Sequence, residues 1–362
     1  MLYLAIDQHS KQLTVNVRNE DGDVLIRRQV STRGDAVEHF LDDLAQRSAN
    51  QGDGYSAILE VCGFNDWLVE LLPRHGCRDV VLVRAPRRRR SKTDRRDADQ
   101  LGELLWINRQ RLLAGQRVQG LRRVEIATPA QRADRRLTIL RRNVGRQRTR
   151  VINQIKHLLM AHNLQHQLPT KGIQTVKARH WLKQLALGDD ERLELNHALA
   201  QWELLDKHLQ QLEQRIAQRQ AQHPTAAIVA SIPGCGAYSA LAIASRIGCI
   251  ERFKTPRSLA NYFGLVPGCR NSGEAAQRLG SITKEGSPIV RFLLGQLVLH
   301  VLRRDPWMRT WYKRIRLRRG SKIARVAVMR RLTTMLWHML SKREAYQVGG
   351  PPRRKLAATP TG

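Results

Sequence analysis

Four carboxylates stand where separate elements of the chain are predicted to end or begin. Asp7 ends the first apolar strand, Glu60 lies near the end of the fourth strand, and Asp94 and Asp97 open a helix on one face. Strand ends and a helix N-terminus often converge at one rim of a sheet. Such a cluster repels itself unless a cation is bound, and hard oxygen ligands suit Mg²⁺ or Mn²⁺. Two such ions ~4 Å apart can activate an attacking oxygen and stabilise a leaving one in phosphodiester chemistry.

Each acid also has an ordinary interpretation. Asp7 can turn the chain before His9, while Asp94 and Asp97 can be the cap and first-turn acid of a helix. Glu60 is harder to explain in this way, because a carboxylate directly after an apolar run is poorly placed for solvation. Taken as a set, the four acids favour the metal site.

The elements around these acids predict a mixed α/β sheet in residues 1–84. Strands are predicted at 2–6, 12–17, 24–30, 56–61 and 79–83, and helices at 36–45 and 67–72. A meander of three strands followed by helix, strand, helix and strand indicates a sheet covered by helices.

The charge of the chain points to a polyanionic partner. With 63 Lys and Arg against 31 Asp and Glu, the 362 residues carry a formal charge of +32. Nucleic acid is the leading partner for such an excess. Two basic clusters, 84–96 and 303–331, are predicted to contact phosphates, although a charge run is more often a solvated face. The residues proposed for these contacts are Arg87, Arg88, Arg89, Arg90, Lys92, Lys313, Arg314, Arg316, Arg318, Arg319 and Lys322.

Other classes of protein fit less well. Apolar runs are too short to span a bilayer, and the N-terminus does not resemble a secretory signal, so we expect a cytoplasmic protein without membrane contact. The five cysteines form no CxxC pair, which argues against a zinc site or a disulfide framework.

Residues 130–220 are predicted to form a long helical insertion. Apolar residues recur at 3- and 4-residue steps from Leu195 to Ile216, typical of a coiled-coil seam. The seam fits either a hairpin that closes on itself or pairing between protomers, and periodicity does not separate the two. We favour an intermolecular role.

Residues 223–345 are predicted to form a mainly helical domain. Its sequence Ile232-Pro233-Gly234-Cys235-Gly236 resembles the turn of a helix-hairpin-helix module, Asp305-Pro306 starts a helix, and Gly320 ends one. Four segments are thus expected: 1–108, 109–222, 223–345 and a disordered tail at 346–362.

One serine precedes a glycine in a polar turn of this domain. Ser272 is followed by Gly273, with Arg270, Arg278 and Lys284 nearby. An unactivated serine is a poor nucleophile, so Ser272 by itself is best interpreted as a turn residue.

Together these motifs resemble one family, the Piv-like DEDD insertion-sequence transposases of the "one-ten" group. The most specific string is Lys-Thr-Asp-x-x-Asp-Ala at 92–98. The resemblance runs from Asp7 to about Leu340 and includes the strings at 60–63, 232–236, 264–267, 272–273 and 280–286.

The resemblance implies a RuvC-like, ribonuclease H-type domain with divalent metal held by Asp7, Glu60, Asp94 and Asp97. It implies a second transposase domain in which Ser272 is the nucleophile that joins to DNA, target and donor DNA as substrates, and guidance by a structured noncoding RNA. It also implies a homo-oligomer, a dimer or a tetramer. The chain has Glu-Val-Cys-Gly and Asn-Ser-Gly where the family usually has Glu-Ala-Thr-Gly and a Ser-Ser-Gly-like string. The acids and the serine remain, so we expect an active enzyme.

Two alternatives stay open at this point. A RuvC-like nuclease without strand transfer would share the acids but not need the second domain or its serine motif. A basic protein that binds nucleic acid without catalysis would not need four intact acids.

Overall fold

The first 127 residues form one of two units into which the chain divides, and the second unit begins at Thr128. The computed structural model describes residues 1–50, 54–84, 94–116, 118–119, 121–269 and 279–349; the side chains of Asp94, Arg95, Cys269 and Leu279 lie outside this description.

A mixed sheet organises the N-terminal unit. Its order is β3-β2-β1-β4-β5-β6, with β1 parallel to β4, β4 parallel to β5, and the other neighbours antiparallel. The strands are β1 (Leu2–Gln8), β2 (Gln12–Arg18), β3 (Val24–Ser31), β4 (Tyr55–Glu60), β5 (Cys77–Arg84) and β6 (Arg122–Arg123). The predicted meander and the mixed α/β class are confirmed.

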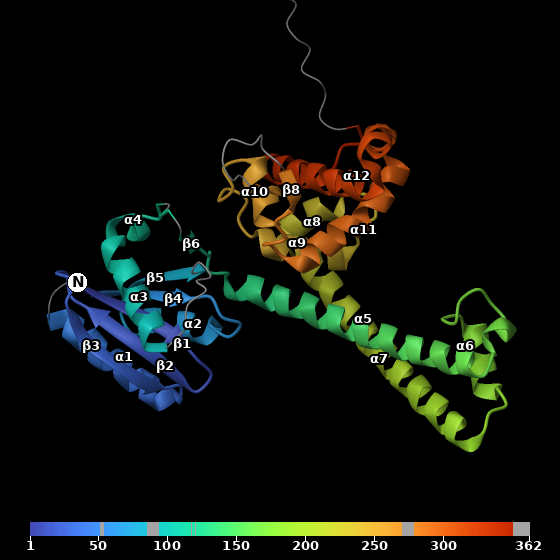
Figure 1. Ribbon diagram of the computed structural model, residues 1–362, viewed down its shortest axis with the longest axis horizontal. Coiled ribbons are helices and arrows are strands. Elements are labelled where there is room, and N and C mark those ends of the chain that lie inside the picture. The colour runs from blue at the N-terminus through green and yellow to red at the C-terminus, as the bar shows by residue number, and fades with distance from the viewer. Residues whose placement is uncertain (51–53, 85–93, 117, 120, 270–278, 350–362) are drawn as a thin grey trace, which may run out of the picture. The chain divides into compact units, whose positions relative to one another are not determined.

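Helices cover both faces of this sheet (Figure 1). On one face Leu4 and Ile6 pack against α1 (Gly34–Asn50) and α2 (Asp66–Arg74). On the other face Tyr3, Ala5 and Ile58 pack against α3 (Asp94–Ile107) and α4 (Arg109–Leu113). Buried side chains form almost continuous runs along β1 and β4 because both faces of these central strands are covered.

The C-terminal unit is mainly helical, as predicted. A long antiparallel pair, α5 (Pro129–Ala161) and α7 (Asp189–Ala221), leads to η1 (Gln165–Gln167) and α6 (Val176–Gln184) at its far end (Figure 1). The remaining helices share one apolar core: α8 (Pro224–Ala230), α9 (Ala237–Ile247), α10 (Pro256–Tyr262), α11 (Pro288–Arg304) and α12 (Pro306–Lys342). A short hairpin joins β7 (Pro267–Cys269) to β8 (Leu279–Ile282).

The boundaries of these units differ from the four expected segments. Residues 109–127 pack with the sheet because β6 pairs with β5, Val83 lying opposite Arg123. Ile216 of α7 belongs to the core of α8–α12, so the helical pair is continuous with the domain that follows it. In the expected tail, the Tyr346 hydroxyl donates a hydrogen bond to buried Asp305, 2.9 Å away, whereas residues 350–362 lie outside the description.

Two predicted helix signals are confirmed. Asp305 is the N-cap of α12 and its carboxylate accepts a hydrogen bond from the Met308 amide at 3.0 Å. Gly320 interrupts α12 with φ of 81° and ψ of 167°, a conformation that suits glycine and splits the helix in two. In the described residues, no helix is both long enough and apolar enough to cross a membrane.

The predicted seam lies in α7 and packs within its own chain. Leu195 and Trp202 are buried against Val151, Ile155 and Leu158 of α5 and their neighbours. Ion pairs fix the register: Asp134 with Arg219, Arg141 with Glu213, and Arg148 with Asp206. The three α5 members are seven residues apart, as expected for helices in knobs-into-holes contact. The seam therefore forms the intramolecular hairpin that was one of the two alternatives.

Asp206 ties together three helices of this hairpin. Its carboxylate accepts hydrogen bonds from Arg148 of α5, at 2.5 Å, and from Arg179 of α6. The Arg179 guanidinium lies 4.1 Å from the ring centre of buried Trp202. Burial alone would raise the pKa of Asp206, but the hydrogen bonds from Arg179 and Arg148 outweigh it and lower that pKa.

We expect Asp206→Asn to lower the free energy of unfolding of the C-terminal unit by about 2 kcal/mol at pH 7, because two guanidiniums lose a charged acceptor. Because the pKa of Asp206 is lower in the folded protein, its carboxylate contributes fully to stability when the pH is above the unfolded-state pKa of about 3.9. The contribution is lost as the pH falls through the folded-state pKa. Urea unfolding at pH 7 and pH 3 measures it. Glu203→Gln, which removes an exposed ion pair with Lys183, is the control and should change little. An equal loss for Asp206→Asn at both pH values would contradict this account.

Candidate functional site

Asp7 and Glu60 lie side by side on one face of the sheet. The parallel register pairs Ile6 with Leu59, so the next residues of the two strands, Asp7 and Glu60, are lateral neighbours. Side chains alternate along a strand, and Asp7 therefore shares the face of Tyr3 and Ala5, while Glu60 shares that of Ile58. This is the face that α3 covers. Both carboxylates are half-buried.

The direction of α3 brings its first residues toward these two acids. Near its end, the Trp106 indole donates a hydrogen bond to the Glu20 carbonyl, 2.9 Å away, beside the start of β1. Farther back, Asp99 accepts a hydrogen bond of 2.7 Å from Asn16, the partner of Ala5. The helix thus runs antiparallel to β1, and its first turn, with Asp94 and Asp97, lies toward the strand end that carries Asp7.

Close packing sets the height of α3 above the sheet. A Cβ added at Gly102 would lie 2.7 Å from the Asn16 side-chain oxygen, so only glycine allows this approach. Ala98, Leu101 and Leu105 are buried on the same side of the helix. Because Asp97 precedes Leu101 by four residues, it belongs to the sheet-facing side.

Two buried amides fix the loop that follows Glu60. The Asn65 amide donates to the Gln8 side-chain oxygen at 2.9 Å and to the Glu60 carbonyl at 3.1 Å, and its oxygen accepts from the Cys62 backbone amide at 2.5 Å. Gln8 in turn donates to the Phe64 carbonyl at 3.1 Å. This Gln8–Asn65 clamp joins the ends of β1 and β4, and no local sequence pattern predicts it.

Several titratable groups lie close together at this rim. The pKa of the Cys62 thiol is raised, mainly by burial and further by the carboxylates of Asp7 and Glu60. The His9 ring lies close to Asp7, with 3.0 Å between its Nε2 and a carboxylate oxygen. A cation at this rim would relieve the repulsion between the neighbouring carboxylates.

The donor set fits a hard divalent cation. Carboxylate oxygens are the ligands that Mg²⁺ and Mn²⁺ prefer. Among the described side chains, no three that could bind a metal (His, Cys, Asp or Glu) lie close enough together to form a metal site. The Asp94 side chain is not among the described ones. The described geometry therefore pairs Asp7 with Glu60, and the union of all four acids stays a prediction.

The two short strands on either side of the Ser272 segment pair with each other. β7 pairs with β8, Pro267 lying opposite Ile282, and Ser272, Arg270 and Arg278 lie outside the described residues between these strands. A Cβ added at Gly264 would lie 2.7 Å from the Glu285 amide nitrogen, so the motifs 264–267 and 280–286 pack directly on each other. Ser281 and Lys284 are exposed in the second of these motifs.

The basic residues expected to contact phosphate divide into two groups. The side chains on α12 are all exposed: Lys313, Arg314, Arg316, Arg318, Arg319 and Lys322. The first basic cluster, Arg87, Arg88, Arg89, Arg90 and Lys92, lies outside the described residues.

The hairpin motif at 232–236 connects α8 to α9, as its sequence predicts. Gly234 has φ of +80°, and a Cβ there would lie 2.3 Å from the His300 ring of α11. This glycine therefore allows both the turn and the close approach of α11.

Comparisons with known proteins support one family. Residues 4–163 match the model of DEDD transposases of the IS110 group, described as a transposase, and residues 226–313 match the model described as transposase IS116/IS110/IS902 family. The chain is similar to the transposase for insertion sequence element IS1111A of Coxiella burnetii, at 27% identity over 72% of this chain and 69% of that protein. A Pseudomonas aeruginosa protein named "Probable family 20 transposase" is 33% identical over 40% of this chain and 46% of its own length.

We expect Asn65→Ala to loosen the end of β4, because the Gln8 side chain and the Cys62 amide lose their partners. The free energy of unfolding of the N-terminal unit should fall by about 1–3 kcal/mol, and alkylation of the Cys62 thiol should become faster. Urea unfolding and mass-spectrometric alkylation rates measure the two effects. Asn50→Ala, at the exposed last position of α1, is the control. Unchanged alkylation of Cys62 in a destabilised Asn65→Ala protein would show that the clamp does not position this loop.

Proposed function

The chain belongs to the IS110 family of DEDD transposases and is a DNA transposase; from this premise we propose that it is a metal-dependent, RNA-guided recombinase with a serine nucleophile. The observation that carries the metal-dependent part of the proposal is the strand register, which makes Asp7 and Glu60 neighbours on the face that α3 covers. The metal ligands in this proposal are Asp7, Glu60, Asp94 and Asp97.

Bound Mg²⁺ or Mn²⁺ would supply charge stabilisation for an attacking and a leaving oxygen. Residues of the chain would hold the positive charge of this ion in position. The parallel register holds two carboxylates side by side, the clamp of Gln8 and Asn65 holds the loop after Glu60, and the close packing at Gly102 sets the height of α3. A carboxylate displaced by one ångström at such a site costs far more in rate than in stability.

Ser272 is the proposed nucleophile toward a DNA phosphate. Its oxygen would form a phosphoester bond while the sugar oxygen of the cleaved strand leaves and takes up a proton. The serine proton must pass to a base, which a carboxylate-lined site can provide when DNA is bound. Arg270, Arg278 and Lys284 would offset the charge on the phosphorus, for which the planar fork of arginine is well suited.

The partners in this proposal are target and donor DNA and a structured guide RNA. Support comes from the net charge of +32 and from the exposed basic side chains along α12. Strand exchange needs two DNA partners held together, so a homo-oligomer, a dimer or a tetramer, is part of the proposal. Since Leu195, Trp202 and Ile216 of the α7 seam are buried within the chain, the assembly is expected to use other surfaces.

One assay tests both the acids and the serine. End-labelled donor DNA is incubated with protein, guide RNA and Mg²⁺, and the products are separated on a denaturing gel. Wild type should give cleaved DNA and a covalent protein–DNA adduct. Asp94→Ala and Asp97→Ala should give neither, because the ligand loss removes transition-state stabilisation rather than core packing. Glu103→Gln, on the exposed side of α3, should behave as wild type.

Variants of the two serines distinguish loss of the nucleophile from loss of the metal site. Ser272→Ala should bind RNA and DNA normally but give no adduct, whereas Ser281→Ala should keep it. An adduct of equal yield in Ser272→Ala would assign the nucleophile to another residue. Cleaved DNA that never carries an adduct in wild type would favour a nuclease without strand transfer.

A further inference from the structure

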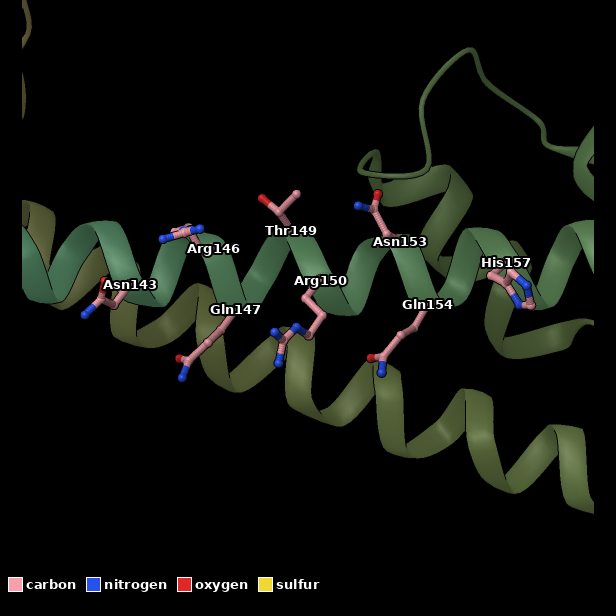
Figure 2. Close-up of a pocket in the computed structure, with 8 residues that line it drawn as sticks. All are labelled: Asn143, Arg146, Gln147, Thr149, Arg150, Asn153, Gln154 and His157. Atoms are coloured by element: carbon pink, nitrogen blue, oxygen red, sulfur yellow. The ribbon is translucent and has the colours of Figure 1, made fainter. Parts of the chain in front are cut away.

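The outer face of α5 carries a stripe of polar and basic side chains that packs on no other part of the described chain. Figure 2 shows these side chains along a single helix, with Arg146 and Asn153 projecting to one side in this view and Gln147, Arg150 and Gln154 to the other. Residues 143, 146, 147, 150, 153, 154 and 157 recur at 3- and 4-residue steps, which confines them to a sector of about 120°. The stripe consists of Asn143, Arg146, Gln147, Arg150, Asn153 and Gln154, with His157 at its end, and all are exposed.

The chemistry of the stripe differs from that of the opposite side of the same helix. Toward α7, the guanidiniums of Arg141 and Arg148 are paired with Glu213 and Asp206. On the stripe, in the described residues, Arg146 and Arg150 have no carboxylate partner. The lone acid of α5, Asp134, is paired with Arg219. The hairpin thus neutralises its inner arginines and leaves the outer ones charged.

A second copy of this chain does not fit such a face. In a two-fold symmetric contact the same patch meets itself, which would set Arg146 and Arg150 against their own positive charges. The ligand that complements guanidiniums interleaved with carboxamides is a nucleic acid. Arginine binds phosphates or the guanine edge, and asparagine and glutamine bind the adenine edge through two hydrogen bonds.

The shape of the helix distinguishes DNA from RNA. The stripe extends over about 21 Å without a break, the length of roughly six base-pair steps. The major groove of B-DNA is wide enough to admit an α-helix, whereas that of A-form RNA is deep and narrow. Because α7 packs on the opposite side of α5, the stripe can enter a groove without a clash from the second helix of the hairpin.

We infer that the outer face of α5 is a second DNA-binding site, which lies in the major groove of a DNA duplex through Asn143–His157. Arg146 and Arg150 contact phosphates at the groove edges, and Gln147 and Gln154 reach base edges. This site is separate from the four acids and from Ser272, so it does not depend on the proposed metal and serine chemistry.

The test is duplex binding by the full chain in EDTA, which keeps the metal chemistry out of the measurement. The probe is a fluorescent 24-base-pair DNA duplex of mixed sequence, followed by anisotropy at several salt concentrations. The double variant Arg146→Gln/Arg150→Gln should weaken binding by about tenfold and reduce the slope of log affinity against log salt by about 2. The matched control is Lys207→Gln/Arg215→Gln, which removes the same charge from exposed positions on α7 and should change affinity less than about twofold.

Removal of the adenine N7 acceptor tests the groove. Duplexes that contain 7-deazaadenine in place of adenine should bind wild type less well, and Gln147→Ala/Gln154→Ala should reduce that difference. Equal losses for the α5 and α7 double variants would overturn the inference, since they would report net charge alone. An RNA duplex of the same sequence that competes as well as DNA would also overturn it, as would a change in oligomeric state of the α5 variant with unchanged duplex binding. Strand cleavage is measured in a separate assay. A wrong assignment of the cleavage chemistry can therefore be distinguished from a wrong assignment of the α5 DNA-binding site.

Discussion

The parallel pairing of β1 with β4 is the constraint on which the candidate site depends. It places two carboxylates side by side at strand ends, on the face that α3 covers. Neighbouring charges of one sign would push these strand ends apart, and the structure resists this by buried apolar packing below them and by the Gln8–Asn65 clamp beside them. The sheet therefore holds two carboxylates in fixed positions, as the proposed cation site requires.

A different balance of charge shapes the second unit. Basic residues dominate α5, and its partner α7 supplies carboxylates to two of them where the helices meet, at Glu213 and Asp206. Trp202 fills the centre of this contact and is covered by the Arg179 guanidinium. Neutralising the inner side of α5 allows the hairpin to fold, while the outer side stays charged. The excess positive charge of the chain thus lies on exposed faces such as α12 and the outer stripe of α5, where a polyanion can reach it.

Much of the fold could be predicted from local sequence. Alternation and short apolar runs located the strands, Asp305-Pro306 located the start of α12, and Gly320 located its break. The helix on which the α7 seam packs could not be predicted, because the heptad spacing fits a helix of the same chain as well as a helix of another protomer. The Gln8–Asn65 clamp was also beyond local reasoning, since its members are far apart in sequence and neither belongs to a periodic pattern. The pairing of Asp7 with Glu60 followed from strand ends alone, but their lateral register required the structure.

The proposed divalent-metal site consists of Asp7, Glu60, Asp94 and Asp97. Its most direct measurement is Mn²⁺ binding to the DNA-free protein by electron paramagnetic resonance, in which bound Mn²⁺ is counted from the loss of the free-ion signal. The account predicts saturable binding in wild type, a loss of at least about tenfold in affinity for Asp7→Ala and for Glu60→Ala, and wild-type binding in Glu103→Gln. Equal Mn²⁺ binding by all four folded proteins would contradict it.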